Sequence, residues 1–413
     1  MIDLSVLQRA CRRLSILETT QIDQILREVA MALRRDSASI LEANEADLSR
    51  MSPADPKYDR LMLNGKRIEA LAQSVEQVAD LPSALGQVLE ERTMPNGLHL
   101  RKISVPLGVV GMIYEARPNV TIDACALCFK SGNAVALKGG KEAAESNAAL
   151  VHAVQSVLRL YALEEAVLLL PGDRAYLATV LQATDYIDVI IPRGSNALIQ
   201  YVREHARVPV IETGAGVVHI YYGVAADLGK GKAVIENSKT RRVSVCNALD
   251  TLIMDATRLG DLPVLVSGLL LEKGVVLYAD PAAFAALQGH FPAERLLPAD
   301  AETFGQEFLD YKMGIKTVRN MEEALEHIAR YSSRHSECIV TEDQAAAQRF
   351  LREVDAAVVY VNVSTAFTDG GEFGLGAEIG ISTQKLHARG PFAMRELTSY
   401  KWVVEGNGQV RNG

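Results

Sequence analysis

The amino-acid sequence predicts an α/β protein with two domains, each built on a largely parallel sheet. The chain has 413 residues, which is more than a single hydrophobic core usually serves. From residue 105 onward, short apolar runs alternate with longer amphipathic stretches, as expected for buried parallel strands joined by helices. A second series of such runs begins at residue 251. The polar and basic segment 236–247 separates the two series, and we expect a cleft between the domains there.

The individual elements can be predicted in order along the chain. Roughly the first 90 residues predict helices, because apolar side chains recur at helical spacing, for example at Ile22, Ile25 and Val29. The first series predicts strands at 109–113, 134–137, 167–170 and 187–191. The second series predicts strands at 251–254, 274–277, 315–318, 338–340 and 357–361. The tail segment 399–404 predicts one more strand, an edge suited to pairing with another chain.

Composition narrows the class of protein. An apolar share of 48%, a charged share of 23% and a formal net charge of -8 are typical of a soluble globular chain, and the acidity argues against a nucleic-acid partner. The N-terminus does not resemble a signal peptide, and no apolar stretch reaches membrane-spanning length, so we expect a cytoplasmic protein without membrane contact. The five scattered cysteines indicate reduced thiols rather than a disulfide framework.

Two glycine-bearing cationic turns follow predicted strands and are candidate phosphate sites. Lys138 and Lys141 flank two glycines after the strand at 134–137, and Gly194 and Ser195 follow Arg193 after the strand at 187–191. Backbone amides at the start of a following helix attract anions. For either turn alone, a solvated loop is an equally good interpretation. A complete Gly-x-Gly-x-x-Gly fingerprint is absent.

Two cysteine-bearing segments invite opposite interpretations. Cys125 and Cys128 have a Cys-x-x-Cys spacing, but they lie in an apolar helix-like run without a second pair, so we interpret them as core residues and expect no metal site. Cys246 follows Lys239, Arg241 and Arg242, cations that would favour the nucleophilic thiolate. The local sequence alone still favours a structural role for Cys246, and only the wider context makes it a catalytic candidate.

That context is a resemblance spread over nearly the whole chain. The segments 115–121 (EARPNVT), 130–134 (KSGNA) and 139–143 (GGKEA) are similar to the γ-glutamyl phosphate reductase family, as are VSVCNA at 243–248 and the glycine-rich segment 368–391. The resemblance implies the aldehyde dehydrogenase-like fold, with a cofactor domain, a catalytic domain and a small β oligomerisation element, and hence a homo-oligomer.

The resemblance also implies a division of the chain. We expect residues 1–243 to form the NADPH-binding domain, with an excursion near 95–106 into the oligomerisation element. Residues 244–385 are expected to form the catalytic domain that carries the nucleophile. Residues 386–413 are expected to form the C-terminal oligomerisation strand and its return segment.

Roles for individual residues follow from the wider superfamily. Cys246 resembles its nucleophile, and Asn119 resembles the asparagine that donates to the thiohemiacetal oxyanion. Lys138 resembles a lysine at the adenine-side ribose, and Glu307 a glutamate at the nicotinamide ribose. Lys141 stands where NAD-dependent relatives place a glutamate, and a cation there suits the 2′-phosphate of NADPH. Gly194 and Ser195 complete the expected cofactor contacts.

The expected substrate is L-glutamyl 5-phosphate, the product of a glutamate kinase, which is a possible partner. Arg117 and Arg193 are candidates to hold its phosphate, although an ordinary ion pair is an equally good interpretation of each. The segment 368–380 is rich in glycine, and we expect Gly374 and Gly376 to line the substrate side of the cleft facing Cys246.

The expected reaction is the NADPH-dependent reduction of the acyl phosphate to L-glutamate 5-semialdehyde in proline biosynthesis, through a thioester on Cys246 and with release of phosphate. The alternative is an aldehyde dehydrogenase running oxidatively, with Glu212 as its general base. A third hypothesis is that the chain is a non-catalytic member of the superfamily. Val218 and Ala366 depart from the expected pattern, because relatives often carry cysteine and arginine there.

Overall fold

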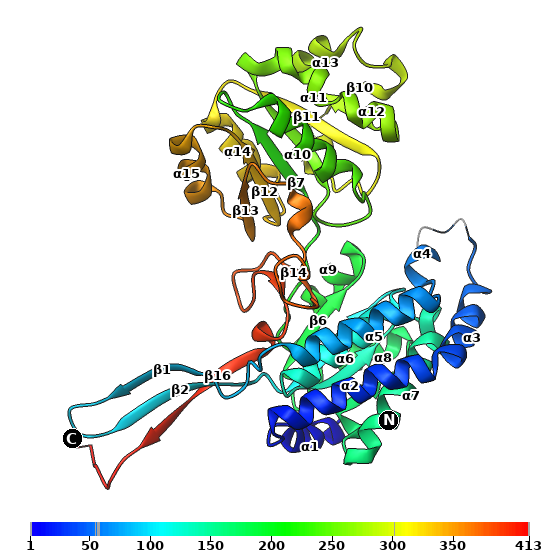
Figure 1. The fold of residues 1–413 in the computed structure, drawn as a ribbon, viewed down its shortest axis with the longest axis vertical. Helices are drawn as coiled ribbons and strands as arrows, with labels where there is room; N and C mark the ends of the chain where they lie inside the picture. Colours follow the sequence, from blue (N-terminus) through cyan, green and yellow to red (C-terminus); the bar gives the residue numbers. More distant parts are fainter. Residues whose placement is uncertain (1, 54, 56–57, 301, 412–413) are drawn as a thin grey trace.

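The computed structural model describes residues 2–53, 55, 58–300 and 302–411, arranged as two lobes and an arm. Figure 1 shows the first lobe around the N-terminal helices, the second lobe above it, and the arm extending sideways from the first lobe. The segment 212–218 and the later segment around β14 (Gly380–Ser382) pass between the lobes. The cleft therefore lies where several chain segments cross.

The first lobe contains a four-stranded parallel sheet in the order β5-β4-β3-β6. Its strands are β3 (Val109–Tyr114), β4 (Ala134–Lys138), β5 (Val167–Leu169) and β6 (Val189–Arg193). Its helices are α1 (Ser5–Leu14), α2 (Thr19–Arg35), α3 (Ser37–Leu48), α4 (Tyr58–Leu61), α5 (Gly65–Asp80), α6 (Pro118–Lys130), α7 (Ala144–Leu158), α8 (Arg174–Leu181) and α9 (Asn196–His205). These strands are almost wholly buried, which explains their uninterrupted apolar sequences.

The second lobe contains a seven-stranded sheet in the order β10-β9-β11-β8-β7-β12-β13, with every pairing parallel. Its strands are β7 (Val218–Tyr222), β8 (Leu249–Asp255), β9 (Val276–Ala279), β10 (Leu296–Pro298), β11 (Lys312–Val318), β12 (Ser336–Val340) and β13 (Val358–Val361). Its helices are α10 (Leu228–Thr240), α11 (Leu262–Leu265), α12 (Ser267–Lys273), α13 (Pro281–Leu287), α14 (Met321–Tyr331) and α15 (Gln344–Glu353). Both predicted strand series are confirmed.

The arm is a three-stranded antiparallel sheet in the order β1-β2-β16. β1 (Val88–Thr93) and β2 (His99–Pro106) form a hairpin, and β16 (Thr398–Glu405) pairs with β2 along its whole length. β2 covers the expected excursion near residues 95–106, and β16 confirms the predicted tail strand. Two exposed aromatic residues on β16 lie near Lys102, whose Nζ is 3.7 Å from the ring centroid of Tyr400. β14 also pairs with β15 (Gly390–Phe392) in a separate two-stranded sheet.

The sheets divide the chain earlier than we expected. β7 pairs with β8 and β12, and α10 contacts β8, so residues 218–240 belong to the second lobe. The expected boundary at 243 therefore lies too late, and the connecting segment ends at Val218. β7 escaped prediction because His219 interrupts its apolar sequence. That histidine is fully buried, and its Nδ1 lies 3.1 Å from a carboxylate oxygen of Glu337 on β12.

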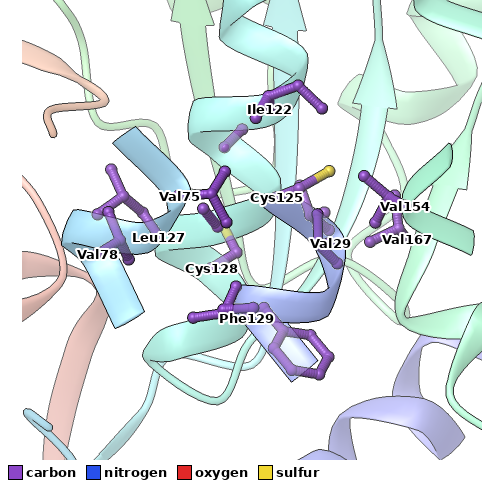
Figure 2. Packing of buried hydrophobic residues seen from close by; sticks show 14 of the residues in the cluster. Val29, Val75, Val78, Ile122, Cys125, Leu127, Cys128, Phe129, Val154 and Val167 are labelled. Atoms are coloured by element: carbon purple, nitrogen blue, oxygen red, sulfur yellow. The ribbon is translucent and has the colours of Figure 1, made fainter. Parts of the chain in front are cut away.

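The first lobe's core settles the interpretation of the Cys-x-x-Cys pair. Cys125 and Cys128 are buried on α6, and Figure 2 shows them among Val29, Val75 and Val154. Burial raises the pKa of both thiols. Their assignment as core residues is confirmed. Among the residues described, no three His, Cys, Asp or Glu side chains group as metal ligands, and no helix is long and apolar enough to cross a membrane.

Two buried histidines in the second lobe predict acid sensitivity. Burial lowers the pKa of His327 to about 3 and that of His335 to about 4, from 6.5. Below pH 6.5 the unfolded chain therefore binds protons that the native chain does not, and the free energy of unfolding falls as the pH falls toward these values. Each histidine contributes a slope of up to about 1.4 kcal/mol per pH unit.

His327→Phe tests this contribution. His327 packs edge-on against Phe304, and within the described chain its Nε2 has no hydrogen-bond partner, so an aromatic replacement should fit. Urea unfolding at pH 7 and pH 5 should show a smaller loss of stability for the variant than for the wild type. An unchanged difference between the two pH values would contradict the assignment.

Candidate active site

Cys246 lies in the second lobe, in the turn between α10 and β8. The neighbouring Asn247 holds this turn, because its Nδ2 donates to the carbonyl oxygens of Thr368 at 3.0 Å and Ala366 at 3.4 Å. Thr365 Oγ1 returns a hydrogen bond to the carbonyl oxygen of Asn247 at 2.8 Å. The start of the glycine-rich segment is therefore fixed beside the cysteine.

The connecting segment approaches the cysteine from the other side at Gly216. A Cβ atom at this position would fall 1.6 Å from the carbonyl oxygen of Cys246, so only glycine allows the two backbones to meet. The amide N–H of Gly216 donates to Glu307 Oε1 at 2.9 Å. In the sequence, Gly214 and Gly216 only resemble the start of a Gly-x-Gly-x-x-Gly fingerprint, whose third glycine is missing.

Four charged residues act on the Cys246 thiol from both lobes. Arg193 and Arg117 favour the thiolate, while Glu378 and Glu307 oppose it. Burial outweighs the cations and raises the pKa of Cys246 to about 12. The thiol of the free chain is therefore protonated at neutral pH.

The expected source of positive charge was wrong. Lys239 is fully buried, and its Nζ donates to the carbonyl oxygen of Leu249 at 2.9 Å. Arg241 and Arg242 are exposed. The cations that act on Cys246 come instead from β6 and from the residue preceding α6, far away in the sequence.

Arg117 and Arg193 form a concentration of positive charge. The pKa of Arg117 is lowered to about 10 by burial and then by Arg193, Arg60 and Arg242. Arg193 Nη1 lies 2.6 Å from the position of a Cβ on Gly380, so its guanidinium packs directly against β14. Within the described ranges, neither Arg117 nor Arg193 forms an ion pair with a carboxylate, which leaves both guanidinium groups available to an anion.

Asn119 lies in the first turn of α6, where Pro118 occupies the first helical position. The Asn119 side chain is exposed, and its Nδ2 donates to Asp123 Oδ2 at 3.3 Å. Burial raises the pKa of Asp123 to about 6. Arg193 and Glu378 act on Asp123 as they act on Cys246, so the carboxyl group that holds Asn119 belongs to the same cluster of charges.

Glu378 is the site residue that sequence reasoning missed. It is largely buried, its pKa is raised by burial, and its Oε2 accepts from the amide N–H of Gly370 at 2.8 Å. It closes the glycine-rich segment 368–380 into a loop whose two ends lie beside Cys246. A single carboxylate in the small-residue sequence Gly-Ala-Glu-Ile-Gly was the available signal.

The middle of this loop contains the two glycines expected at the substrate. Gly374 and Gly376 have φ values of +73° and +74°, which favour glycine. A Cβ on Gly376 would lie 3.0 Å from Leu81 at the end of α5, whereas one on Gly374 would meet no atom within 4 Å. The structure thus brings the loop's ends to the cysteine and packs Gly376 against the first lobe.

The expected cofactor residues lie along the carboxyl edge of the first sheet. Lys138 ends β4, and its buried Nζ donates to the carbonyl oxygen of Gly172 at 2.8 Å; burial lowers its pKa. Beside it lies a cavity of about 340 Å³, whose walls include Gly139, Gly140 and Gly172. Lys141 is exposed, and its Cγ lies 3.4 Å from the position of a Cβ on Gly172.

Ser195 is the N-cap of α9 at the same edge of the sheet. The carboxylate of Glu115 already accepts a hydrogen bond there. The Ser195 amide donates to Glu115 Oε2 at 2.9 Å, and its Oγ lies 3.3 Å from Glu115 Oε1. A Cβ on Gly194 would lie 2.8 Å from the same carboxylate. The turn therefore already holds an anionic group, a carboxylate of the chain itself. Glu307 belongs to the second lobe instead, where it accepts from the Gly216 amide at 2.9 Å and acts on the Cys246 thiol.

Comparisons with known proteins agree with this geometry. A γ-glutamyl phosphate reductase from Pelodictyon phaeoclathratiforme is 56% identical over 409 residues, which cover 99% of this chain and 98% of that protein. The crystal structure of γ-glutamyl phosphate reductase from Thermotoga maritima matches with a TM-score of 0.94 and 39% identity, covering 99% of each chain. This chain belongs to the γ-glutamyl phosphate reductase family. No protein-family model matches the chain.

Membership of the γ-glutamyl phosphate reductase family makes the chain an oxidoreductase. An acetylating aldehyde dehydrogenase from Geobacillus thermoglucosidasius matches with a TM-score of 0.70 at 17% identity, covering 99% of this chain and 97% of that one. The expected aldehyde dehydrogenase-like fold, with parallel sheets and a small antiparallel element, is confirmed.

The structure places the two positions that depart from the expected pattern, and the alternative base Glu212. Val218 begins β7 and is fully buried, so it fills the space of a small core residue. Ala366 offers its carbonyl oxygen to Asn247. Glu212 is anchored by its backbone amide, which donates to Gln384 Oε1 at 2.8 Å, and its carboxylate lies 3.8 Å from Arg203 on α9. The largest charge effects on Cys246 come from other residues, Arg193, Glu378 and Glu307 first.

Opposite effects on thiol reactivity test this electrostatic description. Arg193→Gln should slow the alkylation of Cys246 by iodoacetamide, because losing the cation raises the thiol's pKa. Glu378→Gln should accelerate it, because losing the negative charge lowers that pKa. In each protein the rate should rise about tenfold per pH unit below the pKa.

Mass spectrometry of the Cys246 peptide measures this rate without interference from the other cysteines. Arg203→Gln, on α9 and outside the charges that act on the thiol, is the matched control and should react like the wild type. Equal rates for the Arg193 and Glu378 variants would overturn the assignment of these two charges.

Proposed function

We propose that the chain catalyses the NADPH-dependent reduction of L-glutamyl 5-phosphate to L-glutamate 5-semialdehyde with release of phosphate, a step of proline biosynthesis. The observation that carries the proposal is a thiol on which charged residues of both lobes act, among them two arginines that form no ion pair with a carboxylate in the described part of the chain. Membership of the γ-glutamyl phosphate reductase family supports the substrate.

Cys246 is the nucleophile of the proposed reaction. Its sulfur loses the thiol proton and forms a bond to the acyl carbon, which gives an oxyanion. The bond from that carbon to the phosphate oxygen then breaks, which leaves a thioester and inorganic phosphate, and the phosphate carries away the proton. Arg117 and Arg193 bind the phosphate and lower the cost of forming the thiolate, because both act on Cys246. The amide of Asn119 and the backbone N–H of Cys246 stabilise the oxyanion.

The carboxyl edge of the first sheet holds the cofactor in this proposal. Lys138 and Lys141 bind the adenine-side ribose and its 2′-phosphate, Gly194 and Ser195 receive the diphosphate, and Glu307 orients the nicotinamide ribose. NADPH supplies the hydride that reduces the thioester. The cavity beside Gly139 and the anion-accepting turn at Ser195 support this arrangement.

The arm supports assembly into a homo-oligomer. β1 and β16 are the outer strands of the three-stranded sheet, and Val88, Leu89, Tyr400, Trp402 and Val404 expose large apolar side chains on it. Unpaired strand edges with apolar surface favour association with another chain. A cytoplasmic location and supply of the unstable acyl phosphate by a glutamate kinase complete the proposal, and Gly374 and Gly376 belong to the loop that encloses the substrate.

Oxidation of an aldehyde with Glu212 as base is disfavoured. A general base has to reach the water or proton on which it acts. The Glu212 carboxylate lies 3.8 Å from Arg203 on α9 instead.

Cys246→Ser tests the nucleophile. The serine hydroxyl is a much weaker nucleophile at neutral pH, so turnover should be lost while NADPH binding persists. The reverse assay, which follows NADP reduction with glutamate semialdehyde and phosphate, measures turnover, and quenching of NADPH fluorescence measures binding. Turnover by the wild type without phosphate would refute the acyl-phosphate reaction, and turnover by the variant above a few per cent would refute the nucleophile.

Lys141→Glu tests the choice of cofactor. The substitution places a negative charge where the 2′-phosphate is proposed to bind, so the KM for NADPH should rise far more than the KM for NADH. Lys232→Glu, which makes the same charge change on α10 of the second lobe, is the control and should leave both values unchanged. Equal losses for the two cofactors would show that Lys141 does not distinguish them.

A further inference from the structure

The segment that enters the second lobe is held by side chains at four successive backbone amides. Gly216 donates to Glu307 Oε1 at 2.9 Å and Val217 to Ser333 Oγ at 2.8 Å. Val218 donates to Asp250 Oδ2 at 3.3 Å and His219 to Glu337 Oε2 at 3.0 Å. All four acceptors belong to the second lobe, so the chain is fixed to that lobe from Gly216 into the start of β7.

Asp250 differs from the other three acceptors because it holds a second backbone segment as well. Its Oδ1 accepts from the amide N–H of Phe308 at 3.0 Å, and Phe308 directly follows Glu307. One carboxylate therefore links Val218 to the turn that carries the proposed cofactor glutamate. Glu307 in turn accepts from the amide of Gly216, two residues before Val218. The three hydrogen bonds therefore join the segment 216–218, Asp250 and the turn 307–308 in a ring, called the Asp250 ring below.

The strand register shows how Asp250 reaches both amides. β7 and β8 pair Val218 with Leu249 and His219 with Thr251, so Asp250 is the extra residue at an irregularity in the ladder. Such irregularities redirect side chains and are enriched beside active sites. Asp250 is only 2% exposed, and the buried cation Lys239 favours its ionised form, while burial opposes it and raises its pKa to about 7.

The Asp250 ring affects the proposed nucleophile because Gly216 lies against the backbone of Cys246. With a Cβ position 1.6 Å from the carbonyl oxygen of Cys246, the glycine cannot move toward the cysteine without displacing its backbone. A shift of the connecting segment would therefore change both the thiol's position and that of Glu307.

We infer that Asp250 is a positioning residue that fixes Glu307 and the Gly216 backbone relative to Cys246, so that the thiol and the cofactor meet the same acyl carbon. The inference rests on the proposed function, because it takes Cys246 as the nucleophile and Glu307 as a cofactor ligand. Asp250 itself acts through its two amide partners and touches no reacting atom.

Asp255→Asn provides a matched control for Asp250→Asn. Asp255 lies at the opposite end of β8, is fully buried, and accepts from the Thr257 amide at 3.0 Å and from Tyr221 Oη at 3.3 Å. Both substitutions replace a buried, hydrogen-bonded carboxylate of one strand by an amide, and both should lower the stability to urea. Only Asp250→Asn should also disturb the cleft.

The experiment measures kcat per reactive thiol, the KM for NADPH, and the alkylation rate of Cys246 in the intact chain. Asp250→Asn should lower kcat roughly 10- to 100-fold, because misplacement by a fraction of an ångström to about 1 Å costs rates of this order. Its KM for NADPH should rise, and its alkylation rate should differ from that of the wild type by a factor of about three or more. Asp255→Asn should stay within about twofold of the wild type in all three.

Equal kcat values for the two variants, or a loss of kcat matched by the loss of folded protein, would overturn the inference. Asp250→Ser, which keeps one acceptor oxygen without a misplaced amide group, replaces Asp250→Asn if the latter does not fold. If neither folds, Asp250 is a folding residue and the inference is wrong. Failure of the proposed function is distinguishable, because the wild type itself would then lack phosphate-dependent turnover, while the alkylation rate needs neither substrate nor cofactor.

Discussion

The backbone of Gly216 lies directly against the carbonyl group of Cys246, and through this contact the segment between the lobes meets the nucleophile. Glycine is required there, because any side chain would overlap the cysteine's backbone. The amide of the same glycine donates to Glu307, so one residue joins the thiol to the cofactor side. The sheets of the two lobes fix the positions of Gly216, Cys246 and Glu307 relative to one another.

Burial and the nearby arginines have opposite effects on the pKa of Cys246. Desolvation raises the pKa of Cys246, while Arg117 and Arg193 lower it from positions in the first lobe. Two buried carboxyl groups, those of Asp123 and Glu378, have raised pKa values for the same reason. Two arginines without ion-pair partners, beside carboxyl groups whose raised pKa values oppose ionisation, suit the anionic substrate that we propose. Its phosphate would supply the negative charge that these carboxyl groups provide only weakly.

The sequence predicted the fold better than the site. Buried parallel strands are continuous apolar runs, so both series were recognisable, and β7 was missed because a buried histidine paired with Glu337 interrupts it. At the site, sequence neighbours were a poor guide to charge. Lys239 points into the core, whereas Arg117 and Arg193 come from distant turns. The roles expected for Asn119, Lys138 and Glu307 came from family resemblance and remain predictions.

The roles of Gly216, Glu378 and Asp250 depend on tertiary contacts that no local pattern encodes. Gly216 is special only because Cys246 lies opposite, and Asp250 only because the register of β7 and β8 skips it. The composition of a segment or the spacing of its residues cannot reveal these roles, because each residue's partner lies in another helix, strand or turn. The two carboxylates nearest the proposed cofactor, Glu115 and Glu307, illustrate this, since both already accept from backbone amides.

Those two internal hydrogen bonds constrain how a dinucleotide can gain affinity. Binding a phosphate at Ser195 or a ribose at Glu307 exchanges one hydrogen bond for another, and such exchanges contribute little net free energy. The affinity then has to come from groups without an internal substitute. Lys141 is exposed at the cavity's edge, and the cavity beside Gly139 can bury apolar surface of an adenosine moiety. In the proposed arrangement, recognition of the adenine end would thus provide most of the binding energy, while Glu307 and Ser195 would set the orientation of the nicotinamide end.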